Sequence, residues 1–282
     1  MTFSIVATDG HGSWGVAVAS KFLAVGAAVP AVRAEVGAIA TQAMANLRFL
    51  PDGMAMLESG SAAQKVVDAL MAADDDSAHR QLGVVDANGG AASATGASCM
   101  DWAGGRTGPG YAIQGNILAG EQVVIDMERA WLSGSDLRMA ARLISVLQAG
   151  DAAGGDRRGR QSAAVLVGRR GAGYGGGSDI EVDLRVDDHP DPVQELVRLL
   201  DIHELLFGKP TSTLPIEGDT AVRLRRALDA LGWNNPDLEA ALFDCAGVEN
   251  LEERLVPGHV DPVVLTYLED LVTSRSAGRL GT

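Results

Sequence analysis

Segments typical of strands and of helices come in blocks along this chain instead of alternating one by one. Strand-like runs lie at 2–9, 13–20 and 31–43, and two helix-like segments follow within 53–74. The other expected strands lie at 80–87, 90–96, 103–108, 111–118, 162–170 and 180–188. The other expected helices lie at 121–148, with a break near Gly134, and at 191–207. A doubly wound sheet needs strict alternation of strand and helix, so this order favours an α+β fold of packed layers.

A stretch rich in Pro, Gly and Thr divides the chain into a large and a small part. Residues 208–218, GKPTSTLPIEG, are typical of a linker. We therefore expect one domain at 1–207 and a small, mostly helical module at 219–282. An N-cap at Ser61 is expected to begin the second helix of the large domain.

Charge and composition exclude several classes of partner. The formal net charge of −14 argues against a nucleic-acid partner, which requires a basic face. The most apolar stretch is interrupted by Ser20, Lys21 and Pro30, so neither a signal peptide nor a membrane span is expected, and we expect a cytoplasmic protein. Neither the two cysteines nor the five histidines have metal-ligand spacing, and no dinucleotide fingerprint follows a strand. No metal and no cofactor is therefore expected.

The first twenty residues predict a hairpin that brings three chemically useful side chains together. Two strand-like runs, 2–9 and 13–20, are joined by a Gly-His-Gly turn. Antiparallel pairing across this turn places Thr2 at one end of the sheet beside Ser20 and Lys21.

Thr2 follows the initiator methionine, and removal of Met1 would give it a free α-amine. Such an amine, with a reference pKa of about 7.7–8.0, can accept the proton of the threonine hydroxyl and make it a nucleophile. A neighbouring ammonium such as Lys21 would lower the pKa of that amine further. The alternative is that Thr2 only begins an edge strand and Lys21 is a solvated charge.

The segment GGDRRGRQ supplies a local basic island in an acidic chain. Its candidate substrate-binding residues are Asp156, Arg157, Arg158 and Arg160. Guanidinium groups suit bidentate binding of a carboxylate or phosphate, and the glycines allow a ligand to approach the backbone. The alternative is a structural cluster in which the arginines pair with nearby carboxylates.

Amide side chains follow two of the expected strands and are candidate donors for an oxyanion. These candidates are Gln42, Asn46, Gln114, Gly115 and Asn116. Amides at strand ends also form turns, which is the alternative for each of them.

Several ordered motifs, among them MTFSIVA, WGVAVASKFLAVGAAVP, IATQAMAN, WAGGRTGPGYAIQGNILAG and AGGDRRGRQSAAVLV, resemble the bacterial domain of unknown function 1028 family. That family is similar to the N-terminal nucleophile (Ntn) hydrolases, which implies a four-layer αββα sandwich. The resemblance implies that Thr2 is the nucleophile and that Ser20 and Lys21 occupy the end of the second strand. An aspartate is usual there in proteasome-type enzymes, and this chain has none in that stretch.

The C-terminal motifs LDALGW, ENLEERL and HVDPVVLTYL resemble a peptidoglycan-binding-like module that is often appended to this family. The resemblance implies a peptidoglycan fragment as a possible partner of this module, and a helical packing or oligomerisation role is the alternative. The whole is expected to be an amidohydrolase that cleaves a C–N bond of a small carboxylate-bearing substrate, and to form a homodimer or higher homo-oligomer. The alternative function is a non-catalytic ligand-binding or cell-wall-associated protein with the same fold.

Overall fold

The computed structural model describes residues 2–278 and divides the chain into two compact units. Unit 1 extends to Leu200, and unit 2 begins at Asp201. The division therefore falls within a helix, α5 (Pro192–Phe207), shortly before the expected linker.

Unit 1 contains a six-stranded antiparallel sheet with the strand order β10-β9-β2-β1-β8-β7. Its strands are β1 (Thr2–Thr8), β2 (Ser13–Ser20), β7 (Gly104–Gly108), β8 (Tyr111–Asn116), β9 (Ser162–Arg169) and β10 (Ile180–Val186). The first strand of the chain therefore lies in the interior of the sheet, between β2 and β8, and the expected hairpin is present.

A second antiparallel sheet of four strands has the order β3-β4-β5-β6. Its strands are β3 (Pro30–Arg33), β4 (Gly37–Ala43), β5 (Arg80–Asp86) and β6 (Ala91–Thr95).

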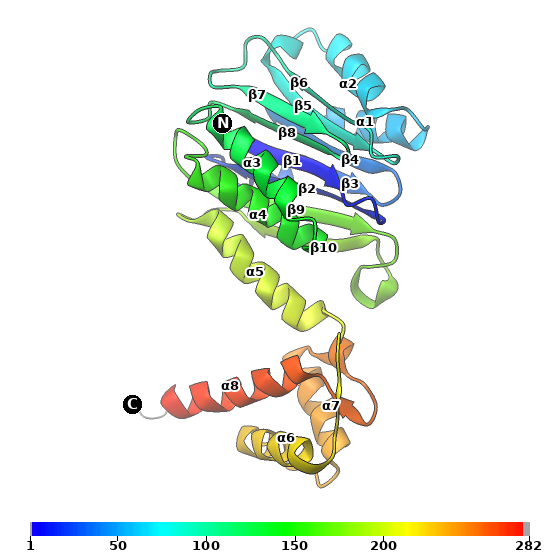
Figure 1. The fold of residues 1–282 in the computed structure, drawn as a ribbon, viewed down its shortest axis with the longest axis vertical. Coiled ribbons are helices and arrows are strands. Elements are labelled where there is room, and N and C mark those ends of the chain that lie inside the picture. Colours follow the sequence, from blue (N-terminus) through cyan, green and yellow to red (C-terminus); the bar gives the residue numbers. More distant parts are fainter. Residues whose placement is uncertain (1, 279–282) are drawn as a thin grey trace. The chain divides into compact units, whose positions relative to one another are not determined.

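Helices cover the outer faces of the two sheets (Figure 1). Helices α3 (Gln122–Ser133) and α4 (Met139–Ala152) pack on the six-stranded sheet. Helices α1 (Phe49–Glu58) and α2 (Ala63–Ala72) pack on the four-stranded sheet. Short 3-10 helices lie at Val25–Ala27, Ser77–His79, Tyr174–Gly176 and Glu252–Arg254. Unit 1 is thus an α+β sandwich of four layers, in the order helix, sheet, sheet, helix, as expected.

Strand alternation explains why β1 is buried on both faces. Phe3 and Ile5 face α3 and α4, while Val6 belongs to the apolar layer between the two sheets together with Val18 and Ala40. Successive side chains of a strand point to opposite faces, so one short segment contributes to two cores. Full burial of each such side chain stabilises the fold by about 1.5–3 kcal/mol.

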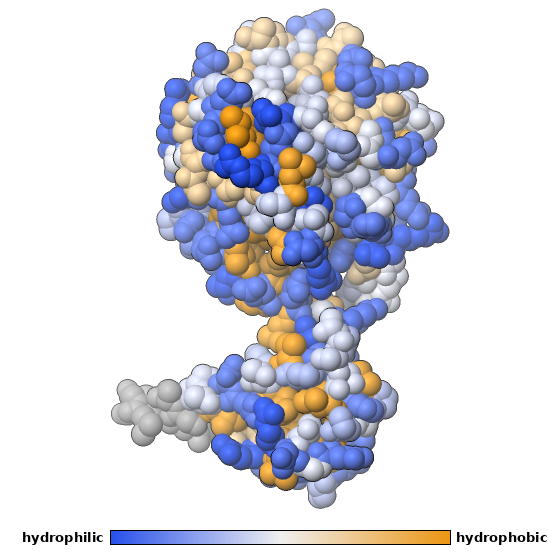
Figure 2. Space-filling view, viewed as in Figure 1, coloured by the Kyte–Doolittle hydropathy of each residue, from blue (hydrophilic) through white to orange (hydrophobic). Residues whose placement is uncertain are grey.

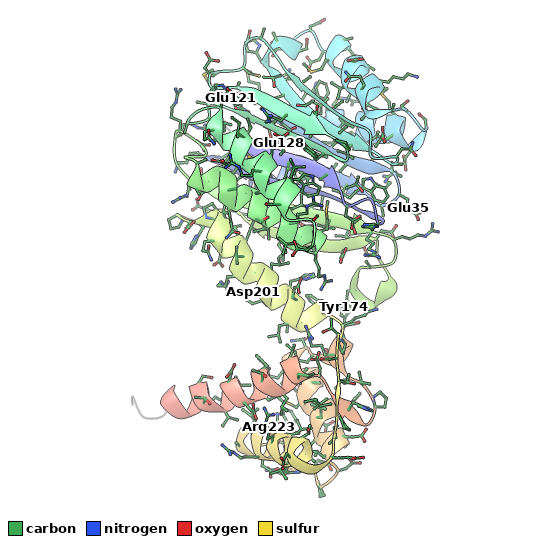
Figure 3. All side chains as sticks on the ribbon, in the orientation of Figure 1. Glu35, Glu121, Glu128, Tyr174, Asp201 and Arg223 are labelled. Carbon is green, nitrogen blue, oxygen red and sulfur yellow. The ribbon has the colours of Figure 1, made fainter. Side chains whose placement is uncertain are left out.

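Polar contacts fasten α3 to the sheet below it. Glu128 lies on α3 (Figure 3). It accepts a hydrogen bond of 2.8 Å from the Tyr111 hydroxyl and forms an ion pair with Arg106. Burial is the main cause that raises the pKa of Tyr111. The Tyr111 hydroxyl therefore remains a hydrogen-bond donor at neutral pH.

The beginning of α2 differs from the expectation. No side chain of the preceding loop caps this helix, and the carboxylate of Asp86, at the end of β5, accepts the N–H of Ala63 at 2.9 Å. The expected N-cap at Ser61 was wrong, because a buried acid from a neighbouring strand takes the role that sequence proximity assigned to the serine.

Unit 2 is mostly helical. Its helices are α6 (Gly218–Leu231), α7 (Leu238–Glu249) and α8 (Pro262–Gly278), and two short strands pair, β11 (Leu214–Pro215) with β12 (His259–Val260). Arg223 of α6 forms a two-pronged ion pair with Glu269 of α8, with distances of 2.9 and 2.7 Å. Part of the expected linker thus belongs to unit 2 as β11.

In the part of the chain that the structure describes, no helix is long and apolar enough to cross a bilayer. Figure 2 shows hydrophilic residues spread over the viewed face of each unit, with small apolar patches between them.

Candidate active site

Thr2, Ser20 and Asn116 form a row across three interior strands, at one end of the six-stranded sheet. Thr2 of β1 is the register partner of Ser20 in β2 on one side and of Asn116 in β8 on the other. Directly paired residues of antiparallel strands carry their side chains on the same face, with Cβ atoms about 4.5–5.5 Å apart. The row therefore presents a hydroxyl, a second hydroxyl and an amide on the face that meets the other sheet.

The hydroxyl groups of Thr2 and Ser20 are within hydrogen-bond distance. The Thr2 Oγ1 to Ser20 Oγ distance is 3.1 Å, and either oxygen can donate. Thr2 is 7% exposed and Ser20 is 2% exposed. The pair is thus enclosed on nearly all sides, where a polar contact is electrostatically stronger than in water.

Gln42 of the four-stranded sheet links the two sheets beneath this row. Its Nε2 lies 3.4 Å from the Thr2 carbonyl oxygen, 3.3 Å from the Gln114 carbonyl oxygen and 2.8 Å from Gln81 Oε1. Its Oε1 accepts the Ser4 hydroxyl at 2.7 Å. The expected amide candidate Gln42 is therefore a fully engaged support for the backbone of β1.

Gln81 joins this network and was not singled out from the sequence. Its Oε1 accepts from Gln42 and, at 3.0 Å, from Asn116 Nδ2, and its own Nε2 donates to Thr95 Oγ1 at 2.9 Å. The sequence signal that could have identified Gln81 is a polar residue within the mostly apolar strand RQLGVVD. Gln81 holds Asn116 in place, and since an amide NH₂ has two hydrogens, one remains for another acceptor.

Gln114 lies deeper between the sheets. It is fully buried, its Nε2 donates to Ser4 Oγ at 2.7 Å, and its Oε1 has no partner among the described residues. The side chain occupies the space above Gly83, where a Cβ atom would lie 2.3 Å from Gln114 Oε1. Gln114 is thus placed to orient Ser4 and Gln42. It is the register partner of Ser4, two residues along the strands from the Thr2–Asn116 pair.

The last two candidate oxyanion donors, Gly115 and Asn46, do not point toward Thr2 in any described contact. Gly115 faces the helices, where a Cβ would lie 2.4 Å from the Leu118 side chain, and its carbonyl accepts Gln81 Nε2 at 2.8 Å. Asn46, in the loop after β4, donates to Asp74 Oδ2, in the loop after α2, at 2.8 Å. Asn46 therefore joins these two loops, and no described contact joins it to Thr2.

Asp156 binds the residue that directly follows β2. Its Oδ2 accepts the backbone N–H of Lys21 at 2.7 Å, and its Oδ1 accepts the backbone N–H of Arg158 at 2.8 Å. The Asp156 side chain is 3% exposed and forms an ion pair of 3.2 Å with Arg158. The carboxylate that β2 itself lacks at this end is thus supplied by the loop after α4.

Some of the other basic side chains at this loop have hydrogen-bond partners, and one has none among the described residues. Arg160 Nε donates to Asp151 at 2.8 Å, and the Lys21 ammonium lies 3.3 Å from the Arg160 carbonyl oxygen. Among the described residues, Arg157 has no side-chain partner, and its backbone N–H bonds the Ile117 carbonyl at 3.3 Å. Of the three arginines, Arg157 is therefore the one available to a ligand.

Three residues with positive φ lie at or shortly after the ends of the strands that form the site. They are Ala24, Ala43 and Ile117, with φ of 52°, 68° and 49°. This conformation is unfavourable for side chains with a Cβ and is an outlier for a β-branched residue such as isoleucine. Such strain gathers at functional sites, where surrounding contacts hold it in place.

Large apolar side chains follow the same strand ends. Phe22 and Leu23 follow β2, Met44 and Leu47 follow β4, and the Met100 carbonyl accepts the N–H of Ile117 directly after β8. All five side chains are more than half exposed. Apolar surface thus borders the end of the sandwich where Thr2 lies.

The fold and the row together define a four-layer α+β domain with a hydroxyl pair at the start of its first strand, followed by a helical unit. The chain belongs to the family of unknown function DUF1028, whose model matches residues 2–196. A family model described as "putative peptidoglycan binding domain" matches residues 205–268. Both family resemblances seen in the sequence are thereby confirmed.

A solved member of the same family supports this assignment. The crystal structure of a DUF1028 protein from Silicibacter pomeroyi shares 30% sequence identity with this chain, with a TM-score of 0.65. The alignment covers 78% of this chain and 92% of the other. A comparison with curated proteins gave no match.

Proposed function

We propose that the chain is an N-terminal-nucleophile amidohydrolase in which Thr2, freed by removal of Met1, attacks an amide carbonyl. The observation that carries the proposal is the 3.1 Å contact between Thr2 Oγ1 and Ser20 Oγ at the start of the first strand. Met1 itself lies outside the described residues. The resemblance of the family to Ntn hydrolases agrees with this placement.

In the proposed acylation step, Thr2 Oγ forms a bond to the substrate carbonyl carbon while its proton passes to the Thr2 α-amine. The Ser20 hydroxyl orients Thr2 Oγ and can relay this proton. The remaining Nδ2 hydrogen of Asn116 donates to the developing oxyanion. When the C–N bond breaks, the leaving amine takes the proton and an ester on Thr2 remains.

In the proposed deacylation step, water attacks the ester carbonyl and gives its proton to the α-amine. The C–Oγ bond then breaks, Thr2 Oγ regains a proton, and a carboxylic acid leaves. We assign Asp156 to positioning, since it binds Lys21 N and the arginine loop rather than the reacting atoms. Lys21 would tune the α-amine through its charge.

Two features support a substrate that is carboxylate-bearing and partly apolar. Arg157 has no side-chain partner among the described residues, and a guanidinium binds a carboxylate with two parallel hydrogen bonds. The exposed side chains of Phe22 and Met44 border the same end of the sandwich and offer contacts to an apolar group. The proposed substrate is therefore a small N-acyl compound with a free carboxylate.

A β-lactone tests the nucleophile without knowledge of the substrate. Its ring opens on attack by a hydroxyl, so the whole reagent mass is added to the protein as an ester. We expect intact-mass spectra of the purified protein to show loss of Met1 and a single adduct, mapped by peptide sequencing to Thr2.

The control variants are Thr2→Ser, expected to be labelled, and Thr2→Ala, expected to remain unlabelled. A native protein that retains Met1 would refute the mechanism, and so would equal labelling of Thr2→Ala. Near-ultraviolet circular dichroism of each variant shows whether its tertiary packing is intact.

The match of unit 2 to a peptidoglycan-binding domain favours a second role, binding of a peptidoglycan fragment. A hollow of about 710 Å³ on this unit is bordered by Val222, Arg226 and Leu238. We expect the full chain to co-sediment with purified peptidoglycan and Val222→Asp to weaken this, while the equally exposed Val248→Asp on α7 leaves it unchanged. Unchanged binding of Val222→Asp would exclude this hollow.

The homo-oligomeric state and the cytoplasmic location remain predictions from the sequence. A homodimer or higher homo-oligomer would be seen by sedimentation velocity. The cytoplasmic location would be tested by fractionation of the producing cells.

A further inference from the structure

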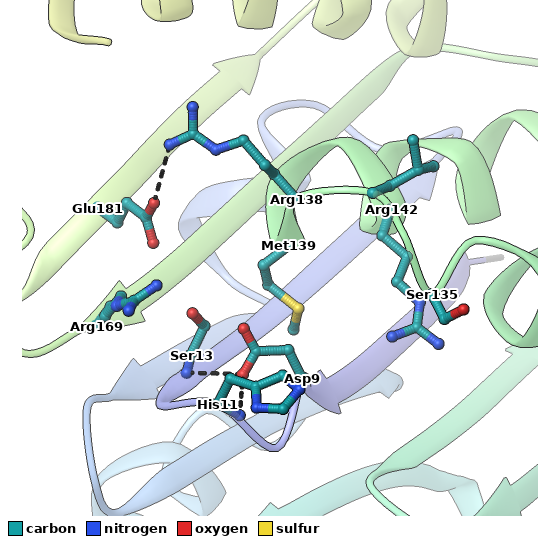
Figure 4. Close-up of a pocket in the computed structure, with 10 residues that line it drawn as sticks. Asp9, His11, Ser13, Ser135, Arg138, Met139, Arg142, Arg169 and Glu181 are labelled. Atoms are coloured by element: carbon teal, nitrogen blue, oxygen red, sulfur yellow. Dashed lines mark hydrogen bonds and ion pairs between the residues drawn. The ribbon is translucent and has the colours of Figure 1, made fainter. Parts of the chain in front are cut away.

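A second pocket lies at the other end of the β1–β2 hairpin from Thr2. It has a volume of about 250 Å³ and is bordered by the turn after β1, the beginning of α4 and the end of β9 (Figure 4). The hairpin register runs from Thr2↔Ser20 to Thr8↔Trp14. At about 3.3 Å per residue, the two ends are roughly 20 Å apart, so this pocket is separate from the proposed catalytic row.

Three guanidinium groups border this pocket, those of Arg138, Arg142 and Arg169. The carboxylates beside them are Asp9 and Glu181. The fixed charges of these five side chains sum to a net positive value, although the whole chain carries a formal charge of −14. A local excess of positive charge attracts small anions.

The two carboxylates are already engaged. Asp9 Oδ1 accepts the backbone N–H of His11 at 2.7 Å and of Ser13 at 3.0 Å (Figure 4). Glu181 forms an ion pair of 3.5 Å with Arg138. These contacts order the turn and the rim of the pocket. Neither carboxylate is paired with Arg142 or Arg169 in them.

Arg142 is held rigidly at the rim. Its Nε and Nη2 donate to the Trp131 carbonyl at 2.9 and 2.6 Å, and its guanidinium carbon lies 3.5 Å from the centroid of the Trp131 ring. Burial lowers the pKa of Arg142. A preorganised and partly desolvated cation loses little conformational entropy when it binds an anion.

Two donors at the pocket remain without a partner. Among the described residues, neither the Arg169 guanidinium nor the Ser13 hydroxyl has one, and Ser13 is 1% exposed. The beginning of α4 is also uncapped, with no side-chain hydrogen bond to its first N–H groups. A helix N-terminus carries partial positive charge that adds to the field of the arginines.

We propose that this pocket is a binding site for a small oxyanion, a phosphate or a short carboxylate, held by Arg169, Arg142 and the Ser13 hydroxyl. The volume is below that of sites for drug-sized ligands, which limits the ligand to a compact anion. Guanidinium groups match both oxyanions with paired hydrogen bonds, and the hydroxyl adds a single donor.

Isothermal titration calorimetry of the full chain at constant ionic strength tests the site with two probes, inorganic phosphate and malonate. We expect saturable binding of at least one probe, weakened about tenfold or more in Arg169→Ala and in Ser13→Ala. The probe that binds more tightly identifies the anion as phosphoryl or carboxylate.

The matched control is Arg170→Ala, the neighbouring arginine, which pairs with Glu35 at 2.6 Å and does not border the pocket. We expect it to bind like wild type. Absence of binding by both probes would overturn the proposal, and so would an equal loss in the Arg169 and Arg170 variants. Labelling of Thr2 is a separate readout, so its outcome does not bear on this site.

Discussion

The Asp156 carboxylate accepts the backbone N–H of Lys21 at 2.7 Å although 135 positions separate the two residues. This contact fixes the end of β2 against the loop that carries the three arginines. A hydrogen bond to an ionised acceptor is shorter and stronger than one between neutral groups. Ser20, at the end of β2, is the register partner of Thr2 at the start of β1, and the backbone N–H of Arg157 in the same loop bonds the Ile117 carbonyl after β8.

Replacing Asp156 by Ala is expected to destabilise unit 1 by about 2–3 kcal/mol, since two backbone N–H groups lose a buried, charged acceptor. The midpoint of urea unfolding measures this. The control is Asp183→Ala, whose half-exposed carboxylate lies 3.8 Å from Arg185 and should change stability by less than about 0.5 kcal/mol. Equal effects of the two variants would contradict the role of Asp156.

Ser20→Ala is expected to slow acylation of Thr2 by about 100-fold, because the hydroxyl that orients Oγ1 is lost. The rate of β-lactone adduct formation, followed by intact mass, measures this. Ser20→Thr keeps a hydroxyl and should recover much of the rate. A rate in Ser20→Ala equal to that of wild type would show that the 3.1 Å contact has no role in acylation.

Arg157→Ala is expected to weaken recognition of a substrate carboxylate. Two β-lactones that differ only in a free carboxylate serve as probes, and we expect the variant to lose about tenfold in labelling rate with the charged probe alone. Lys209→Ala in unit 2 is the control for a general loss of positive charge. Equal slowing of both probes by Arg157→Ala would argue against carboxylate binding.

Gly83→Ala is expected to destabilise unit 1 by about 1–3 kcal/mol, because the new methyl group would overlap the buried Gln114 side chain. Gly120→Ala is the matched change, since a Cβ there meets nothing within 4 Å. Thermal unfolding of both variants measures the difference. A Gly83 variant as stable as the Gly120 variant would mean that Gln114 moves away at little cost.

Asp74→Asn is expected to lower stability at pH 7 and to matter less in acid. The side-chain hydrogen bond from Arg80, followed by that from Asn46, holds the pKa of Asp74 below its usual range. A depressed folded-state pKa contributes stability above the unfolded value of about 3.9, and this contribution is lost as the pH falls below it. Urea unfolding at pH 7, 4 and 3 measures the difference between variant and wild type. A difference that grows in acid would contradict this assignment.

The sequence predicted the local order of unit 1 well, because strand periodicity and glycine turns are short-range signals. The hairpin at 2–20 is present with Thr2 opposite Ser20. The amides were harder to interpret. Asn116 lies beside Thr2, whereas Asn46 binds Asp74, and both had been candidates on the same grounds.

What the sequence determined by itself is the set of strands and helices, the block order that requires packed layers, and the position of Thr2 at the start of a strand. Only the tertiary structure decided that Gln81 and Asp156 support the site and that Arg157 is left unengaged. Strand formation depends on neighbours along the chain, whereas these polar contacts depend on which strand ends and loops meet when two sheets pack. A buried polar group must find a hydrogen-bond partner, and that partner can come from any position in the sequence that the fold brings close.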